Sequence, residues 1–233
     1  MNVPYQLSIA DKRDAMKSCI LFSIVALIVF CAISEGQPAK SKGTTPAMQT
    51  TPHSQKEIAV LQTSMGTFEF ELYRNDAPKT VENFVKLAEK KYFDGMRFHR
   101  VAKGFVIQTG DPNSKDPAKA AAWGTGRESI YGKEFDDELN PDTPSAKEGY
   151  KKGVVAMANH GPNTNTSQFF VCLRDVALPH KYTIFGKVVK GMGVVENIGQ
   201  VEIVPQMGPA DGRPKKDVIL KKVTIRREKS SSK

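Results

Sequence analysis

The sequence is poor in the residues that build disulfide-stabilised or cysteine-ligated metal proteins. It contains 3 cysteines among 233 residues, and two of them, Cys19 and Cys31, lie in an apolar run near the N-terminus. Cys172 is therefore the one cysteine in the body of the chain, inside the apolar, strand-like stretch SQFFVCL. A lone cysteine in such a stretch is typically a small buried hydrophobe, so a disulfide framework and a cysteine metal site are both excluded.

Several familiar catalytic motifs are also missing. The chain has no glycine-rich phosphate loop, no pair of histidines at metal-binding spacing and no serine nucleophile elbow. The acidic run EFDDEL at 134–139 lacks the oxygen-ligand spacing around a tight glycine turn that calcium loops have, and it reads as a solvated loop. His99 alternates away from its neighbours and is expected to be a hydrogen-bonded structural residue. We therefore expect neither a metal nor a cofactor.

Acidic residues are fewer than basic ones, which gives a formal charge of +9 from 34 Lys and Arg against 25 Asp and Glu. The basic residues are spread along the chain in ones and twos. This dispersion favours a solvated surface, and no nucleic-acid partner is expected. A basic interaction domain for RNA or sulfated glycans is the alternative, and binding that weakens steeply with salt would support it.

One long apolar run is present, CILFSIVALIVFCAI at 19–33, preceded by three basic residues. Its length fits the core of a signal peptide within residues 1–34, with translation starting at Met1 or Met16. An uncleaved signal anchor formed by residues 18–34 is the competing interpretation, because short helices can span a locally thinned bilayer. We expect a protein of the secretory pathway, either in the endoplasmic reticulum lumen, secreted, or anchored in the membrane.

The remaining chain divides into a polar linker and one domain. Residues 35–57 are rich in Ser, Thr, Pro, Gly and Lys and predict a disordered linker, and residues 229–233 predict a disordered tail. Residues 58–228 alternate in the manner of strands, with two helices predicted at APKTVENFVKLAEKKYF and around 191–199. Two strands should flank Met65 and Gly66, and further strands are expected at 97–101, 105–109, 153–158, 168–173, 182–189 and 217–226. The pattern favours a mainly β fold with a closed antiparallel sheet.

Two separated clusters stand out, FHRVAKGFVIQTGD at 98–111 and GVVAMANHGPNTNTSQFFV at 153–171. The first places a fixed cation, Arg100, among apolar residues. Together with APKTVENF, GTGRESIYG and KYTIFGKV, in this order along the chain, they resemble the cyclophilin family of peptidyl-prolyl cis/trans isomerases. The resemblance implies a closed eight-stranded antiparallel barrel capped by two helices, with a substrate groove on its outer face.

The resemblance also implies a reaction and a set of site residues. Arg100 would donate a hydrogen bond to the prolyl amide, and Gln108 would orient it. The residues implied to bind substrate are Phe105, Val106, Ala158, Asn159, Thr164, Gln168, Phe170, Leu178 and Tyr182. The partners would be proline-containing peptides and the unfolded or loop segments of client proteins, bound by a monomer.

This chemistry explains why the usual catalytic motifs are absent. Rotation about an X-Pro bond crosses a barrier of roughly 18–20 kcal/mol because the amide has partial double-bond character. No bond is made or broken, so the catalyst needs only to bind the twisted amide better than the planar forms. The twisted nitrogen becomes more basic, and a fixed cationic donor stabilises it.

Some positions depart from the common family pattern. Val106, Ala177 and Tyr182 stand where the family commonly has Met, Trp and His. Because the family's Trp contributes to binding the cyclic peptide ciclosporin, we expect weak ciclosporin affinity with isomerase activity retained. The missing wall at Ala177 also keeps open an alternative, a proline-peptide binding or chaperone module with weak or no catalysis.

Two local features remain. The segment 112–123 is longer than its family counterpart and carries the single tryptophan, Trp123, whose effect on partner choice is left open. The sequence NTS at 165–167 is a glycosylation sequon, but it falls in the expected groove, where folding should protect Asn165.

Overall fold

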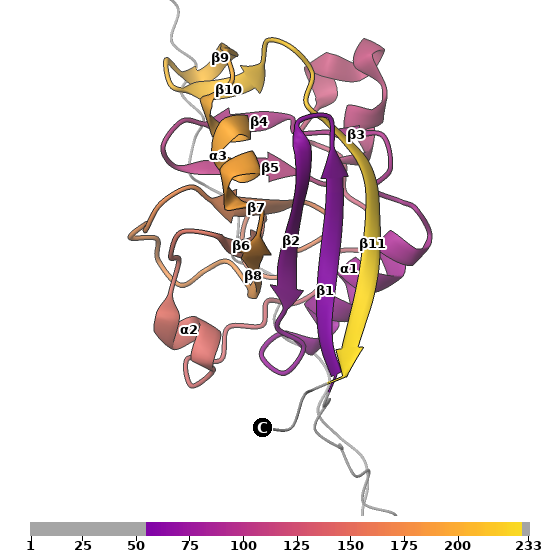
Figure 1. The fold of residues 1–233 in the computed structure, drawn as a ribbon, viewed down its shortest axis with the longest axis vertical. Coiled ribbons are helices and arrows are strands. Elements are labelled where there is room, and N and C mark those ends of the chain that lie inside the picture. The colour runs from indigo at the N-terminus through magenta and orange to yellow at the C-terminus, as the bar shows by residue number, and fades with distance from the viewer. Residues whose placement is uncertain (1–54, 230–233) are drawn as a thin grey trace, which may run out of the picture. The chain divides into compact units, whose positions relative to one another are not determined.

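A single antiparallel sheet organises residues 55–229, the part of the chain that the computed structural model describes. Its strand order is β3-β11-β1-β2-β8-β6-β7-β5-β4-β10-β9, and the sheet curls around its core (Figure 1). The strands are β1 (Gln55–Thr63), β2 (Gly66–Leu72), β3 (Met96–Arg97), β4 (Arg100–Ala102), β5 (Val106–Thr109), β6 (Val154–Met157), β7 (Phe169–Cys172), β8 (Ile184–Lys190), β9 (Ile203–Gly208), β10 (Asp211–Pro214) and β11 (Ile219–Lys229).

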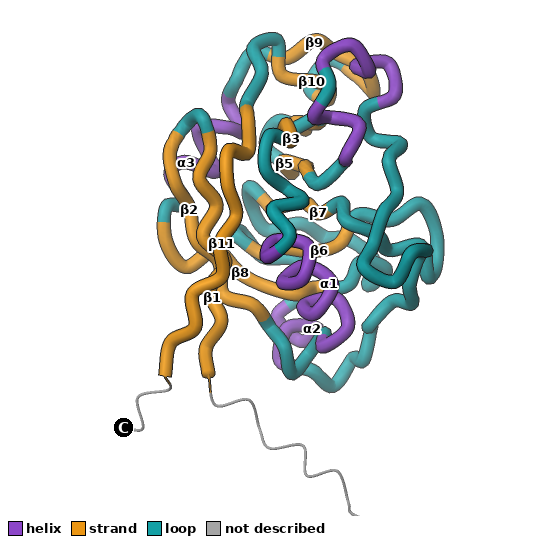
Figure 2. Tube along the Cα trace, turned by 90° about the vertical axis from the view of Figure 1, so that its right-hand side faces the viewer, coloured by secondary structure: helices purple, strands orange, loops and turns teal. Residues whose placement is uncertain are grey.

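The longest ladder joins the two ends of the described chain. Strand β1 pairs with β11 from Gln55 opposite Lys229 to Thr63 opposite Leu220, and the two strands run side by side in Figure 2. On the other side of β1, strand β2 turns Phe68 and Phe70 into the core. The predicted hairpin around Met65 and Gly66 is therefore confirmed.

Both predicted helices are present, with a third, shorter one. Helix α1 (Pro78–Glu89) begins with proline, whose missing N–H costs nothing in the first turn, and it buries Val81, Phe84 and Val85 along one stripe. The Glu138 carboxylate accepts hydrogen bonds from the first backbone amides of α1 and so caps the helix. The others are α3 (Met192–Gln200) and α2 (Pro144–Glu148).

At strands β6 and β7 the sheet has apolar residues on both of its faces. Successive side chains of a strand point to opposite faces, and in β7 Phe169 joins the main core while Phe170 joins a second apolar cluster on the other face. The second cluster also contains Ala102, Val106, Tyr150, Val154, Ala156, Cys172 and Ile184. The fold thus builds an apolar surface behind the sheet as well as a core inside it.

The strand count differs from the expectation. The structure has eleven strands rather than eight, and no ladder among residues 55–229 joins β3 to β9, so the closed eight-stranded barrel is not confirmed. Part of the difference is the hairpin of β9 and β10, which the sequence did not reveal because β9 is largely exposed and lacks alternating apolar residues.

One predicted boundary needs correction, and the structure also shows how the long segment 112–123 folds. Strand β1 begins at Gln55, so Gln55–Glu57 belong to the sheet and not to the predicted linker. The long segment 112–123 is not an irregular loop: it folds into two 3₁₀ helices, η1 (Pro112–Lys115) and η2 (Pro117–Ala122), each begun by an aspartate side chain that accepts a backbone amide hydrogen bond.

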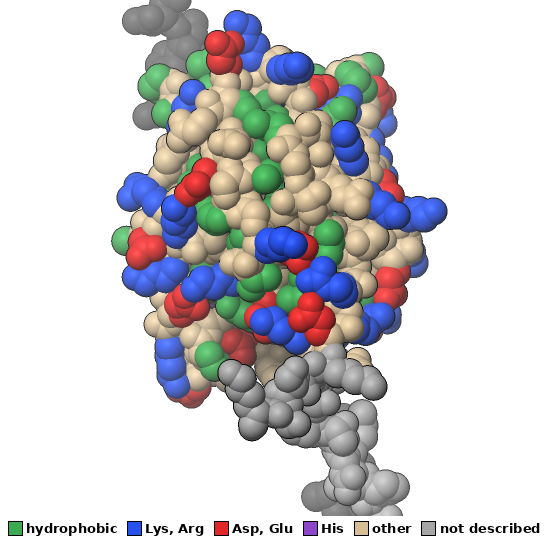
Figure 3. Space-filling view, viewed as in Figure 1, with side chains coloured by type: hydrophobic (Ala, Val, Ile, Leu, Met, Phe, Trp, Pro, Cys, Tyr) green, Lys and Arg blue, Asp and Glu red, His purple; other side chains and the backbone are tan. Residues whose placement is uncertain are grey.

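The predicted signal segment, and all of the predicted linker except residues 55–57, lie outside the described residues, as do residues 230–233. Within 55–229 no helix is long and apolar enough to cross a membrane. The same part of the chain holds no group of three or more potential metal ligands. On the face shown in Figure 3, basic and acidic side chains are interspersed rather than gathered by sign.

Candidate active site

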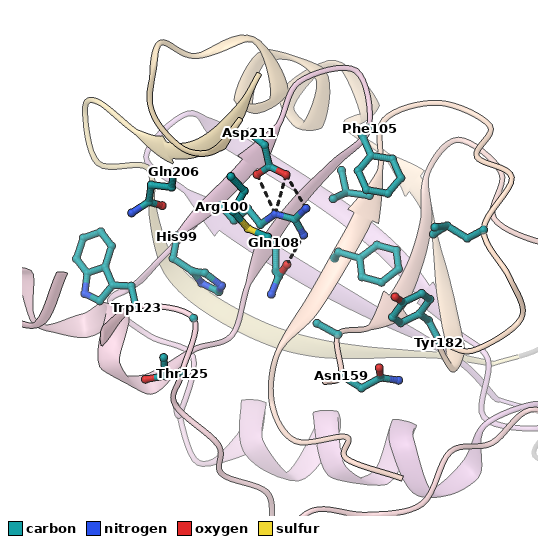
Figure 4. A pocket seen from close by; sticks show the side chains of 16 residues that line it. His99, Arg100, Phe105, Gln108, Trp123, Thr125, Asn159, Tyr182, Gln206 and Asp211 are labelled. Carbon is teal, nitrogen blue, oxygen red and sulfur yellow. Dashed lines mark hydrogen bonds and ion pairs between the residues drawn. The ribbon is translucent and has the colours of Figure 1, made fainter. Parts of the chain in front are cut away.

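A groove of about 390 Å³ opens over the second apolar cluster. Nine of the eleven residues predicted for the site line it, brought together from three separate stretches of the chain (Figure 4). These nine are Arg100, Phe105, Val106, Gln108, Ala158, Asn159, Phe170, Leu178 and Tyr182.

The register of four neighbouring strands puts the central residues in one row. Arg100 of β4 lies opposite Gln108 of β5, and Gln108 lies opposite Phe170 of β7. Phe170 in turn lies opposite Ala156 of β6. Directly opposed residues in a sheet share a face, so pairing alone places a cation, an amide, an aromatic ring and a small residue in sequence across the groove floor.

The apolar end of the groove is tightly packed. Phe170 is only 6% exposed, and the ring of Tyr182 meets it edge to face, with centroids 5.6 Å apart. The Tyr150 hydroxyl fixes the Tyr182 backbone, since it donates to the Tyr182 carbonyl at 2.9 Å and accepts from the Tyr182 amide at 3.0 Å. This end offers a rigid, shape-defined pocket for a compact apolar group.

The polar end is a chain of side-chain hydrogen bonds. Arg100 Nη1 donates to Gln108 Oε1 at 3.2 Å, and Gln108 Nε2 donates to Gln168 Oε1 at 3.0 Å. Gln168 Nε2 then donates to the carbonyls of Gly124 and Gly126 at 3.0 and 2.9 Å. Gln168 is therefore buried behind the groove lining, where it supports Gln108.

One buried carboxylate, that of Asp111, holds the loop that supplies the Gly124 and Gly126 carbonyls. Asp111 accepts hydrogen bonds from the amides of Asn113 and Gly124. Burial raises the pKa of Asp111, although these amides oppose the shift. A side chain at residue 126 would collide with this carboxylate, because a Cβ there would lie 2.1 Å from Asp111 Oδ1, so the turn requires glycine.

Arg100 has a second partner that the sequence did not indicate. The Asp211 carboxylate accepts from Arg100 Nη2 at 2.7 Å and from Nε at 2.9 and 3.2 Å, a two-point contact drawn in Figure 4. The Arg100 side chain remains 27% exposed. A partly exposed, always-charged donor beside a packed apolar pocket can stabilise a developing lone pair or partial negative charge on a bound group.

Burial disfavours the charged forms of His99 and Cys172, two residues that could otherwise act as an acid–base group or a nucleophile. Burial away from water lowers the pKa of His99 to about 4, and the positive charge of Arg100 acts in the same direction. Neither ring nitrogen has a hydrogen-bond partner at ideal distance and angle among the described residues, but Gln168 and the Arg97 backbone lie close enough to oppose the fall of the His99 pKa. Burial raises the pKa of the Cys172 thiol to about 12, which confirms it as a buried apolar residue and not a nucleophile.

Two predicted positions depart from the groove. Thr164 is not part of the lining: its hydroxyl donates to the Gly161 carbonyl at 2.7 Å and so stabilises a turn. Ala177 lines a neighbouring hollow that shares Leu178 with the groove. The sequon residue Asn165 is fully buried, and its amide donates to Asp137 at 2.7 Å, as its expected protection requires.

Sequence reasoning missed seven lining residues on the side of the groove beyond Arg100. Two signals could have found part of this wall: Trp123 is the only tryptophan, and it lies in an unusually long segment. The seven residues are His99, Trp123, Gly124, Thr125, Gln206, Met207 and Asp211.

Comparisons with known proteins agree with this geometry. The sequence profile of the family described as cyclophilin type peptidyl-prolyl cis-trans isomerase matches residues 58–225. The mouse protein named peptidyl-prolyl cis-trans isomerase-like 1 is 47% identical over 152 residues, which is 65% of this chain and 84% of that protein. The Neurospora crassa protein of the same name is 45% identical over 175 residues, covering 74% and 95%.

Solved structures are similar as well. A cyclophilin type peptidyl-prolyl cis-trans isomerase from Cryptosporidium parvum superposes with a TM-score of 0.63 at 32% identity, covering 73% of this chain and 98% of that one. A second structure of that protein, determined in the presence of the dipeptide Ala-Pro, gives a TM-score of 0.62 at 32% identity and covers 72% and 98%.

Proposed function

The chain belongs to the cyclophilin-type peptidyl-prolyl cis-trans isomerase family, and from this premise we propose that it accelerates X-Pro bond rotation in client polypeptides by hydrogen bonding from Arg100. The observation that carries the proposal is the row in which Arg100 and Gln108 stand beside the Phe170 pocket. The Ala-Pro dipeptide used with the related Cryptosporidium parvum protein supports proline-containing peptides as ligands.

Arg100 keeps donors available for a substrate. A guanidinium has five N–H bonds, and Nε, Nη1 and Nη2 each use one in contacts with Asp211 or Gln108. One N–H on each terminal nitrogen remains. As the prolyl amide twists and loses resonance, the lone pair of its nitrogen is no longer delocalised into the carbonyl. The nitrogen can then accept a hydrogen bond from one of these N–H groups, whereas the planar forms accept more weakly.

The rest of the groove holds the substrate around this donor. Phe105, Val106, Phe170 and Leu178 surround the pyrrolidine ring and exclude water, and Tyr182 closes the pocket against Phe170. One N–H of the Asn159 side-chain amide donates to the Lys181 carbonyl at 2.8 Å, which fixes the side chain and leaves its oxygen and second N–H for a substrate. We assign the substrate-backbone contacts to the main-chain and side-chain polar groups of Ala158 and Asn159, except the Ala158 amide, which donates to the Gln168 carbonyl at 3.0 Å.

Proline-limited refolding of a test protein, followed with and without the full-length chain, tests the enzyme assignment. The uncatalysed step takes tens to hundreds of seconds, so acceleration is easily measured. The Arg100→Ala variant should lose roughly 100-fold or more of kcat/KM. Arg226→Ala is the matched control, because Arg226 lies on β11 and pairs with Glu69 outside the groove. A wild-type chain that gives no acceleration over buffer refutes the assignment.

A proline-peptide binding or chaperone module with weak catalysis is the second candidate. The observation that favours it is Ala177, which leaves the Leu178 side of the groove without the wall that the family's Trp supplies. If the wild-type protein binds proline peptides but does not accelerate isomerisation, this second function is the correct one. Under either function, ciclosporin should bind weakly, and a nanomolar dissociation constant would contradict that expectation.

We also propose that the protein enters the secretory pathway. The proposal rests on the apolar run at 19–33 and the basic residues before it. N-terminal sequencing of the mature protein tests it: a terminus just after residue 34 or 36 would show signal cleavage, and retention of the run in a membrane fraction would show an anchor. A soluble protein that keeps its N-terminus would refute both forms.

A further inference from the structure

The β9–β10 hairpin is bulged at the point where it meets the groove. Asp211 of β10 pairs with Gly208, but the next residue, Gly212, pairs with Pro205, so Gln206 and Met207 of β9 have no partners in the ladder. Gln206, Met207 and Asp211 all line the groove. Bulges of this kind redirect side chains near functional sites, and here one bulge supplies three of the residues that line the groove.

The backbone at this bulge has little freedom. Asp211 and Gly212 of β10 pair with Ala102 and Val101 of β4, the strand that begins with Arg100. A Cβ on Gly212 would lie 2.1 Å from the Val204 carbonyl oxygen, so the two strands approach closer than any side chain allows. The Asp211 carboxylate is therefore presented to Arg100 from a fixed backbone.

Strand β10 also contacts the long segment 112–123, through Arg213 and Trp123. Arg213 lies two residues from Asp211, on the same side of β10, and its guanidinium carbon is 5.3 Å from the centroid of the Trp123 ring. Arg97 packs on that ring at 5.5 Å and is itself held by Asp217 at 2.5 Å. Trp123 thus links the hairpin to β3 through two cation–π contacts.

We propose that Asp211 is a positioning residue for isomerisation, which holds the Arg100 guanidinium in its donor orientation, and that the Arg213–Trp123–Arg97 stack holds β10 in place for this task. The proposal deepens the proposed function and rests on it. Gln108 alone fixes one terminal nitrogen, whereas the Asp211 carboxylate fixes the opposite edge of the guanidinium. With both partners present, the donor is oriented before substrate arrives.

The opposite effect is physically conceivable and is distinguished by its sign. A carboxylate could draw the guanidinium away from the prolyl nitrogen, in which case its removal would raise the rate. Asp211→Ala should instead lower kcat about tenfold, in the range that a misplaced catalytic group costs. The dissociation constant of a proline peptide should stay within about twofold, because the apolar pocket is untouched. Asp211→Asn, which keeps an acceptor but loses the charge, should fall between.

Glu202→Gln is the matched control. Glu202 is a carboxylate immediately before β9, and it is exposed and paired with Lys215 outside the groove. It should leave kcat unchanged. Trp123→Ala should lower kcat less than Asp211→Ala does. In an Arg100→Ala background, Asp211→Ala should have no further effect, since a positioning residue acts only through the group that it positions.

A second readout does not depend on catalysis. The Nε–H resonance of Arg100, assigned by its loss in Arg100→Ala, should exchange slowly with water in the wild type and rapidly in Asp211→Ala, which has no acceptor. If the wild type accelerates no isomerisation, the proposed function fails and this resonance still decides whether Asp211 holds Arg100. An unchanged or increased kcat in Asp211→Ala, an equal loss in the Arg100→Ala background, or an Nε–H exchange rate that Asp211→Ala leaves unchanged would overturn the positioning role.

Discussion

The two ends of the groove are built in different ways. The apolar end, around Phe170 and Tyr182, is the exposed edge of a buried cluster, so its shape depends on the packing of the sheet. The polar end, around Arg100, is a set of hydrogen bonds between half-buried side chains from segments as distant as β4 and β10. Binding and stability should therefore change together at the packed floor of the apolar end, whereas catalysis should be separable from stability at the polar end.

Phe170→Ala breaks the apolar end and should have the largest effect. The ring is almost fully buried between the strands, and its loss leaves a cavity that costs about 3–5 kcal/mol of unfolding free energy. Proline-peptide affinity should fall in the same variant. Denaturant unfolding and peptide titration measure the two effects.

Phe105→Ala is the control for ring loss, because Phe105 lies at the groove surface and is only partly buried. It should weaken peptide binding with a much smaller change in unfolding free energy. Equal destabilisation by both variants would contradict the distinction between the packed floor and its rim.

His99, next to Arg100, connects the polar end to stability through pH. Its pKa is about 4 in the folded chain and about 6.5 when unfolded. Between these values the unfolded chain binds the additional proton, so the free energy of unfolding should fall as pH drops from 6.5 to 4, by about 3 kcal/mol from this group. Above pH 6.5 both states are neutral and the contribution disappears.

His99→Leu should remove that part of the pH dependence, since leucine fills the buried site without a group that titrates. Urea unfolding of both proteins across this pH window isolates the histidine, because carboxylates that titrate at similar pH contribute to both curves. Parallel curves for wild type and His99→Leu would show that His99 is not the group responsible.

Sequence pattern was sufficient where neighbours in the fold obey local rules. The apolar stripe of α1 predicted which of its side chains turn inward, and the family resemblance put Arg100, Gln108 and Phe170 in one groove. The sequence did not predict the contact between Asp211 and Arg100, which are far apart in the chain. Strand β9 is exposed and has no apolar alternation, and the pair Asp211-Gly212 carries no signal of such a contact. Thr164, which the resemblance implies to bind substrate, has its hydroxyl bonded within its own turn and is not in the groove lining.

Gln108→Ala tests the polar end with an intermediate effect. Its amide connects Arg100 to Gln168, so its loss should lower kcat about tenfold, equivalent to about 1.4 kcal/mol of barrier, and change unfolding free energy by less. Gln62→Ala, an exposed glutamine in β1, is the control and should change neither quantity. Destabilisation comparable to Phe170→Ala would show that the two ends are not separable.

Ala177→Trp tests the apolar end by addition, with the smallest expected effect. Ala177 lines the hollow beside the groove and precedes Leu178, which lines both. A tryptophan there should widen the apolar surface at the groove edge and tighten ciclosporin binding about threefold, equivalent to about 0.7 kcal/mol, as one added aromatic contact allows. The polar end is unaltered, so kcat should remain close to that of the wild type. Ala118→Trp, at an exposed alanine of η2 outside the groove lining, controls for the added surface, and equal tightening by both variants would mean that the missing wall is not what limits affinity.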